Sequence, residues 1–166
     1  MPELNPHGLS LWEDKQTGRT VLFVVNHPLD ETVDYISIFN YDVATNSLTH
    51  LKSITHPDFG MLNDVVATGP ESFYTTRYHY SRTHALLGKL EMYTGLGLGA
   101  IFFHDGENTK FVDSNLLVPN GINISPDGKY VEQAKIFLDE FYVIAVHIIL
   151  GRKKLFNKDK GIHCLY

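Results

Sequence analysis

A strand-and-turn pattern that recurs at a nearly fixed interval constrains the fold of this chain more than any other feature. Three segments, 5–25, 62–76 and 119–131, each contain near their start a polar residue followed by Gly or Asp, and each continues as an alternating strand, a polar turn and further strand. The leading polar residues are His7, Asn63 and Asn120, spaced by 56 and 57 residues. Such a period is typical of a β-propeller, whose blades are four-stranded sheets. The alternative is chance similarity among short strand-turn patterns.

Periodicity between residues 20 and 130 favours strands. Residues 20–27 form a β-branched and aromatic run of strand length, and further hairpins are predicted over 34–54, 64–80 and 99–113. Only residues 84–96 also fit a helix. The sequence therefore predicts an all-β fold, and if the repeat is a propeller repeat, three blades would be half of a six-bladed ring.

Composition limits the partners of the chain. With 166 residues it is long enough for one domain, and its formal net charge of -5 provides no basic footprint, so nucleic acid is not an expected partner. The N-terminus lacks the basic start and apolar core of a signal peptide. The apolar run from Tyr142 to Leu150 is too short to span a bilayer. A single cysteine, Cys164, cannot form an internal disulfide.

The three leading residues suggest a metal site. In a propeller, equivalent positions at the start of each blade's first strand meet at one end of the central channel, so His7, Asn63 and Asn120 are expected to converge there with Asp64. Converging amide and carboxylate oxygens suit a hard cation, Ca²⁺ above all. Each residue alone also has a structural explanation, because Asn120-Gly121 can be a turn and Asn63-Asp64 a strand-edge cap.

Several segments carry a resemblance to a known family. They are "NPHGLS" (5–10), "VVNHP" (24–28), "LNDVVATGPE" (62–71), "FYTTRYHY" (73–80), "EMYTGL" (91–96) and "NGINISPDGKYV" (120–131). In order and spacing, from about residue 4 to Val131, they resemble the serum paraoxonase/arylesterase family. The resemblance implies a six-bladed propeller with two calcium ions in its channel, and hydrolysis of aryl esters, lactones and some organophosphates. It also implies an extracellular or secretory setting, with association to lipoprotein or membrane.

The resemblance also assigns residues. Asn63 and Asn120 match ligands of the family's catalytic calcium, whereas Asp64 matches a ligand of the structural calcium, together with the backbone carbonyl of Leu9. His7 and His27 match the histidine pair proposed for proton transfer, with His7 as base and His27 as relay. The alternative is that His27 only ends a strand and His7 only packs near the ion.

The resemblance ends after Val131, where the charge balance also changes. Residues 1–130 carry 8 Lys and Arg against 15 Asp and Glu, whereas residues 131–166 carry 6 against 4. We therefore expect a partial propeller over residues 1–131 and a divergent tail over 132–166, whose residues 142–150 could pack on the last blade. We also expect the family's other acidic metal ligands to lie outside this chain.

Three functions fit these expectations. The first is a calcium-dependent arylesterase/lactonase whose metal site is incomplete in this chain. The second is a catalytically silent half-propeller that self-associates through open sheet edges. The third is a gluconolactonase-like hydrolase of sugar lactones.

Overall fold

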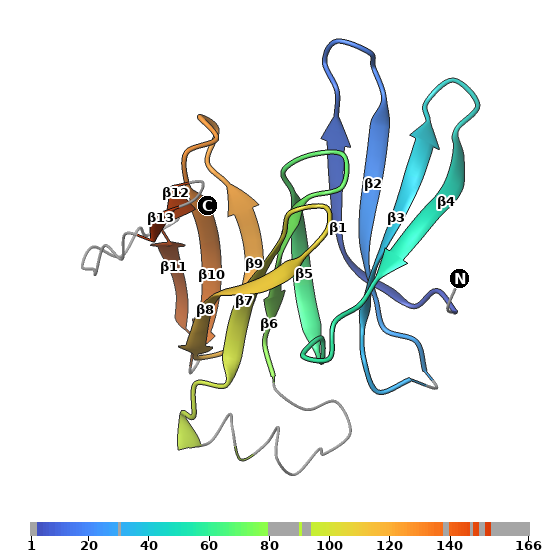
Figure 1. Cartoon of the computed structure of the whole chain (residues 1–166). Helices are drawn as coiled ribbons and strands as arrows, with labels where there is room; N and C mark the ends of the chain where they lie inside the picture. The colour runs from blue at the N-terminus through green and yellow to red at the C-terminus, as the bar shows by residue number, and fades with distance from the viewer. Residues whose placement is uncertain are drawn as a thin grey trace.

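Three antiparallel sheets of three or four strands follow one another along the described part of the chain, and a two-stranded sheet comes after them (Figure 1). The computed structural model describes residues 3–29, 31–79, 90, 94–137, 140–146, 148–149 and 152–153. The segment that also fits a helix, 84–96, lies mostly outside these residues. Within the described part of the chain, no helix is long and apolar enough to cross a membrane.

Each sheet is built from strands that are consecutive in the sequence. The first has the order β1-β2-β3-β4 (Pro6–Glu13, Thr20–Asn26, Tyr35–Asp42 and Ser47–Ile54). The second has the order β5-β6-β7-β8 (Leu62–Ala67, Phe73–Arg77, Gly99–His104 and Thr109–Leu116). The third has the order β11-β10-β9 (Glu140–Val146, Val131–Phe137 and Pro119–Ile124). A short ribbon pairs β12 with β13 (Ile148–Ile149 and Arg152–Lys153).

This arrangement is that of adjacent propeller blades. The sheets lie side by side in chain order, and the first strand of each neighbours the first strand of the next, because β1 packs beside β5 and β5 beside β9 (Figure 1). The predicted hairpins are all present, with turns at the predicted polar segments. The chain is therefore an all-β, partial β-propeller of about three blades, as the sequence predicted.

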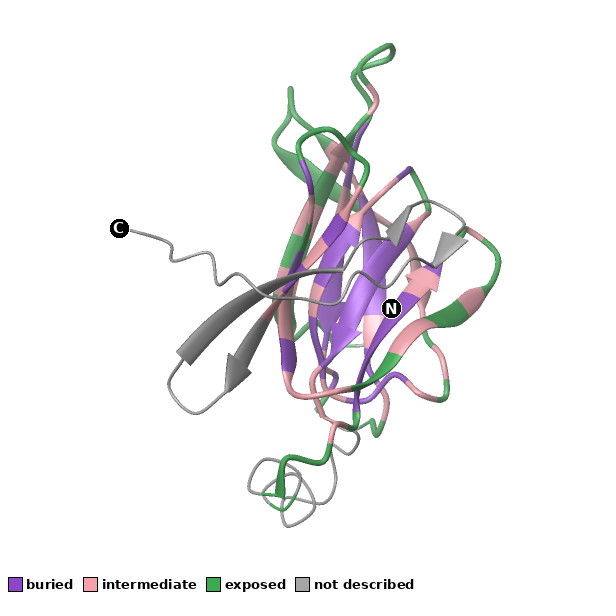
Figure 2. Cartoon of the chain, turned by 90° about the vertical axis from the view of Figure 1, so that its left-hand side faces the viewer, coloured by how far each residue is buried: buried purple, intermediate pink, exposed green. Residues whose placement is uncertain are grey.

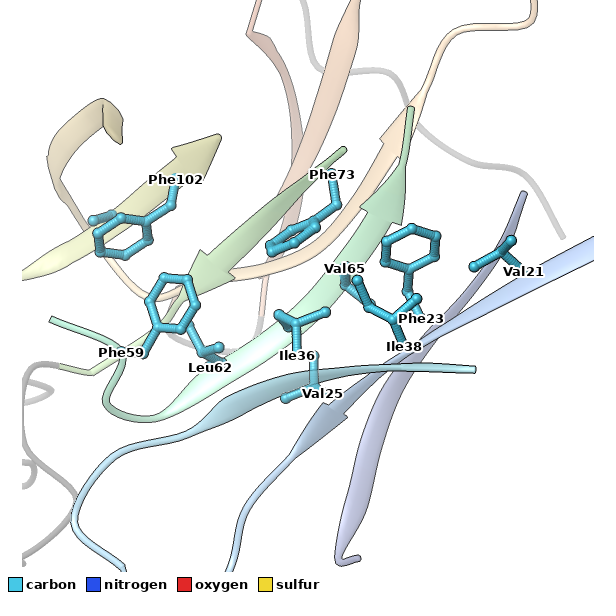
Figure 3. Packing of buried hydrophobic residues seen from close by; sticks show 11 residues of the cluster. Val21, Phe23, Val25, Ile36, Ile38, Phe59, Leu62, Val65, Phe73 and Phe102 are labelled. Atoms are coloured by element: carbon cyan, nitrogen blue, oxygen red, sulfur yellow. The ribbon is translucent and has the colours of Figure 1, made fainter. Parts of the chain in front are cut away.

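The middle sheet is buried on both faces. Val65 and Phe73 point into a cluster shared with the first sheet, whereas their neighbours Val66 and Tyr74 point into a second cluster shared with the third sheet. Figure 3 shows the first cluster, in which Phe23 and Ile38 face Val65. Since successive strand residues point to opposite faces, burial of both faces explains the apolar runs Val65–Ala67 in β5 and Ala100–Phe103 in β7. Figure 2 shows the buried residues gathered between the sheets, with exposed residues at the hairpin ends.

The first sheet has one uncovered face. Leu9 and Leu11 on β1 and Leu48 on β4 point away from the second sheet and are 58%, 60% and 52% exposed. The opposite face carries Trp12 and Val21, which pack into the core shared with the second sheet. Three large aliphatic side chains thus lie in solvent on the face where a propeller would place another blade.

The domain boundary predicted after Val131 falls inside the third sheet. β10 begins at Val131, pairs with β9 along one edge and pairs with β11 along the other. The backbone of residues 140–146 therefore extends the sheet that starts at Pro119.

Candidate functional site

A β-bulge interrupts the first strand of each sheet at the same place. In all three sheets, two residues of the first strand stand opposite a single residue of the second strand. The bulge pairs are His7-Gly8 in β1, Asn63-Asp64 in β5 and Asn120-Gly121 in β9. A bulge bends the strand and redirects its side chains, and bulges are frequent beside active sites. The three leading residues of the sequence repeat are therefore the first residues of three equivalent bulges.

Two of these bulges are preceded by strained backbone. Met61 has a φ of +49° and Val118 a φ of +41°, and each stands two positions before the leading asparagine of its bulge. Positive φ is unusual for any residue with a Cβ, and for a β-branched one it is an outlier. Such a conformation costs of order 1–3 kcal/mol and persists where the surroundings enforce it, often at functional sites.

Asp64 lies where β1, β5 and β9, the inner strands of the three sheets, approach one another. Its Oδ1 accepts the N–H of Val65 (2.9 Å) and its Oδ2 accepts the N–H of Ile122 on β9 (3.0 Å). On the other side the carboxylate lies against Gly8 of β1, where a Cβ atom would come within 2.5 Å of Oδ1. The second position of the bulge is glycine in β1 and β9, but only in β1 would a Cβ atom clash with Asp64, because at Gly121 it would lie 3.7 Å from Oδ2.

Thr76, which stands opposite the β5 bulge, joins Asp64 to Asn120. Its hydroxyl accepts the N–H of Asp64 (3.2 Å) and donates to the backbone carbonyl of Asn120 (2.7 Å). Thr76 is fully buried. One side chain thus fixes the spacing between the second and third inner strands at the position of the predicted metal ligands.

The predicted ligands differ in burial. Asn63 is buried, Asp64 and Asn120 are half-buried, and the side chain of Leu9 is exposed. Leu9 was predicted to contribute only its backbone carbonyl, and it follows Gly8, which lies against Asp64. Among the described residues no cluster of three or more His, Cys, Asp or Glu could hold a metal ion. Any cation here would therefore depend on amide and backbone oxygens in addition to one carboxylate.

The two predicted histidines are neighbours. The rings of His7 and His27 have centroids 5.3 Å apart and are almost perpendicular, at 85°. His7 belongs to the β1 bulge and is exposed, whereas His27 directly follows β2 and its side chain is 15% exposed. The histidine pair and the Asp64 cluster are thus joined through the His7-Gly8 bulge.

The residues Gly8, Thr76 and Asp34 complete the site, although none of them was predicted as a site residue. Asp34 is fully buried, and its Oδ1 lies 2.8 Å from Nδ1 of His27. Burial raises the pKa of Tyr78, and the negative charge of Asp34 raises it further. Glycine next to His7 within "NPHG" is the one sequence signal for close strand approach. Thr76 lies within "FYTTRYHY" (73–80) without an assigned role, and Asp34 belongs to none of the quoted segments.

The chain was compared with family models and with known proteins. The family model described as Arylesterase matches residues 1–165, which extends past the predicted boundary at residue 131. Chicken (Gallus gallus) serum paraoxonase/arylesterase 2 is 41% identical over 143 residues, 86% of this chain and 39% of that protein. Human serum paraoxonase/arylesterase 2 is 38% identical over 155 residues, 93% of this chain and 43% of that protein. Rat (Rattus norvegicus) serum paraoxonase/lactonase 3 is 39% identical over 145 residues, 87% of this chain and 40% of that protein.

Among solved structures, regucalcin from Agrobacterium tumefaciens, a calcium-binding protein, is similar with a TM-score of 0.44 and 18% sequence identity. The similarity covers 94% of this chain and 60% of regucalcin. The chain spans about 40% of the length of the curated relatives that it matches. Because the family model covers almost every residue, this chain belongs to the arylesterase family.

Proposed function

We propose that this chain forms part of a calcium-dependent hydrolase of aryl esters and lactones. The observation that carries the proposal is the alignment of three bulges, which brings a carboxylate and two asparagines to neighbouring inner strands beside a histidine pair. Membership in the arylesterase family supports the same chemistry. The substrate class, an uncharged ester or lactone, is part of the proposal.

The residues at the bulges suit calcium in their chemistry. Asn63 and Asn120 offer amide oxygens, Asp64 a carboxylate and Leu9 a backbone carbonyl. Ca²⁺ prefers six to eight oxygen ligands in a flexible geometry, and carboxylates, amides and backbone carbonyls all serve as such ligands. Each Asp64 oxygen accepts one backbone N–H and retains a second lone pair. We propose that these residues hold the ion, and since they are fewer than calcium prefers, we expect an affinity in the millimolar range.

The histidine pair provides the proton transfer. Hydrolysis requires a water molecule to lose a proton as it attacks the carbonyl carbon, and a neutral imidazole within reach can accept that proton. We assign this role to His7, which is exposed, and the relay role to His27, whose ring lies against it. A bound calcium would supply positive charge beside the carbonyl oxygen, where negative charge develops in the transition state.

A second candidate is a catalytically silent module. Two observations favour it. The bulges carry only one carboxylate, so the described residues offer few acidic ligands for a metal. The first sheet also exposes apolar side chains, namely Leu9, Leu11 and Leu48. In that case the chain would associate with other copies rather than turn over substrate. A sugar-lactone hydrolase of gluconolactonase type shares the proposed metal chemistry and differs only in the preferred substrate.

Calcium titration and turnover separate these candidates. We expect calorimetry on the chain to give a millimolar dissociation constant, and phenyl acetate hydrolysis to depend on added calcium. Asn120→Ala should weaken both, whereas Asn108→Ala, in the exposed β7–β8 turn, should alter neither. Calcium-independent hydrolysis would contradict the proposed role of the metal. Calcium binding without turnover of phenyl acetate would favour the silent module, and preference for a sugar lactone would favour the third candidate.

The location and the partners of the protein are also part of the proposal. We propose an extracellular or secretory location, as the family resemblance implies, with a small ester or lactone as partner and with lipoprotein or membrane association in the family's manner. Fractionation of cells that express the chain with its natural flanking sequence would test the location.

A further inference from the structure

Asp34 is a buried carboxylate held in place from several sides. It lies just before β3, in the connection that follows His27, and none of its surface is exposed. Its Oδ2 accepts the N–H of Leu62 (2.7 Å), and its own N–H donates to the carbonyl of Phe59 (2.8 Å). Its carbonyl accepts the hydroxyl of Thr55 (2.9 Å). A buried carboxylate is costly unless it is paired and hydrogen-bonded, and these contacts supply part of that stabilisation.

The second oxygen of Asp34 faces His27. Oδ1 lies 2.8 Å from Nδ1, which is itself buried. The contact is within hydrogen-bond distance but is not well aligned, so the carboxylate acts on the ring chiefly through its negative charge. An ionised carboxylate only accepts hydrogen bonds, and it repels a lone pair on a nearby nitrogen. The carboxylate therefore favours the imidazole form that carries its proton on Nδ1.

We propose that Asp34 is a positioning residue that holds the proton of His27 on Nδ1 and leaves Nε2 as the nitrogen that exchanges a proton with His7. The proposal rests on the function proposed above and assigns a third member to its histidine pair. A base that is oriented by a carboxylate behind it is a recurring arrangement in hydrolases, where the carboxylate fixes both tautomer and ring orientation. In this proposal Asp34 acts through His27.

The tautomer of His27 can be measured without any turnover. Long-range ¹H–¹⁵N spectra of the ¹⁵N-labelled chain distinguish a ring protonated on Nδ1 from one protonated on Nε2. We expect the Nδ1–H form in the unmodified chain. Finding His27 as the Nε2–H form in the folded chain would overturn the proposal, and this measurement needs no variant.

Asp34→Asn gives the sharper test. The amide is nearly isosteric, so its oxygen can still accept the N–H of Leu62 while its NH₂ group donates to Nδ1 of His27. We expect the Nε2–H tautomer to appear in this variant, with the other amide resonances little changed. The matched control is Asp58→Asn, because Asp58 lies 3.6 Å from the ring of a different histidine, His56. The control should leave the His27 tautomer as it was; an unchanged tautomer in folded Asp34→Asn would overturn the proposal.

Turnover adds a separate readout. If the chain hydrolyses phenyl acetate, Asp34→Asn should lower kcat by about 10²-fold with little change in KM, a typical size for the loss of acid–base assistance. Asp58→Asn should leave kcat unchanged. Failure of the unmodified chain to hydrolyse any ester would count against the proposed function, whereas the tautomer of His27 would still decide the inference about Asp34.

Discussion

A Cβ atom at position 8 would lie 2.5 Å from Oδ1 of Asp64, closer than side-chain carbons approach other atoms in folded proteins. The same atom would lie 2.7 Å from the backbone carbonyl oxygen of Asn63. Two inner strands thus approach each other at their bulges to a separation that only glycine permits, and the carboxylate of Asp64 fills the space that a side chain would otherwise take.

Gly8→Ala should therefore destabilise the chain. The added methyl group meets backbone as well as the carboxylate, so relief requires β1 and β5 to separate, and overpacking of this kind costs roughly 1–3 kcal/mol. Urea unfolding measures the loss. Gly121→Ala is the matched control, because its Cβ would make ordinary contacts of 3.7 Å with Asp64 and 4.0 Å with Ala134. Equal stability of the two variants would contradict the close approach of β1 to β5.

Thr76→Val should be destabilising although it preserves shape. The substitution removes the hydroxyl that accepts from the N–H of Asp64 and donates to the carbonyl of Asn120. Leaving such partly buried groups unpaired costs about 1–3 kcal/mol. Thr45→Val, in the exposed β3–β4 turn, removes a hydroxyl whose partner Ser47 can bond to water instead, and it should change stability by less than about 0.5 kcal/mol. A similar unfolding midpoint for both variants would refute the bridging role of Thr76.

The stabilisation that Asp127 provides in the β9–β10 turn should be lost in acid. The hydroxyl of Ser125 (2.7 Å) and the N–H of Lys129 (3.2 Å) donate to Asp127, and together with the Lys129 ammonium they lower the pKa of Asp127 from 3.8 to about 2. Because the folded carboxylate binds its proton less readily than the unfolded one, its contribution to stability is complete above pH 3.8 and is lost as the pH falls toward 2. Urea unfolding at pH 5, 3 and 2 should show a steeper decline for the unmodified chain than for Asp127→Asn. An equal loss of stability in both proteins as the pH falls would show that Asp127 does not cause the acid sensitivity.

We propose that the uncovered face of the first sheet makes the chain self-associate. Leu9 and Leu11 on β1 and Leu48 on β4 are exposed on that face, and exposed apolar surface recruits other chains. Size-exclusion chromatography with light scattering should show oligomers, and the double substitution Leu11→Lys with Leu48→Lys should shift them toward monomer. Val43→Lys is the control, since Val43 is equally exposed but lies in the β3–β4 turn. A sharp monomer peak for the unmodified chain would rule out association through this face.

The sequence was a good guide to the strands and to their spacing. Alternation of apolar and polar residues located the hairpins, and the interval from His7 to Asn63 to Asn120 identified positions that the structure shows to be equivalent bulges. The bulges themselves were not predicted, because one extra residue in a strand leaves little trace in the alternation. The contacts of Thr76 and Asp34 were missed for another reason. They join residues that only the folded arrangement of three sheets brings together, and neither residue type signals such a role by itself.

The three equivalent bulges separate the shape of the site from its chemistry. The backbone follows the same course in β1, β5 and β9, yet its first bulge position carries an imidazole in one strand and amides in the other two, and its second carries a carboxylate once and hydrogen twice. The repeated backbone therefore provides three equivalent pairs of side-chain positions. The different residues at these positions make β5 the acidic strand, β1 the strand with the imidazole and β9 the neutral strand.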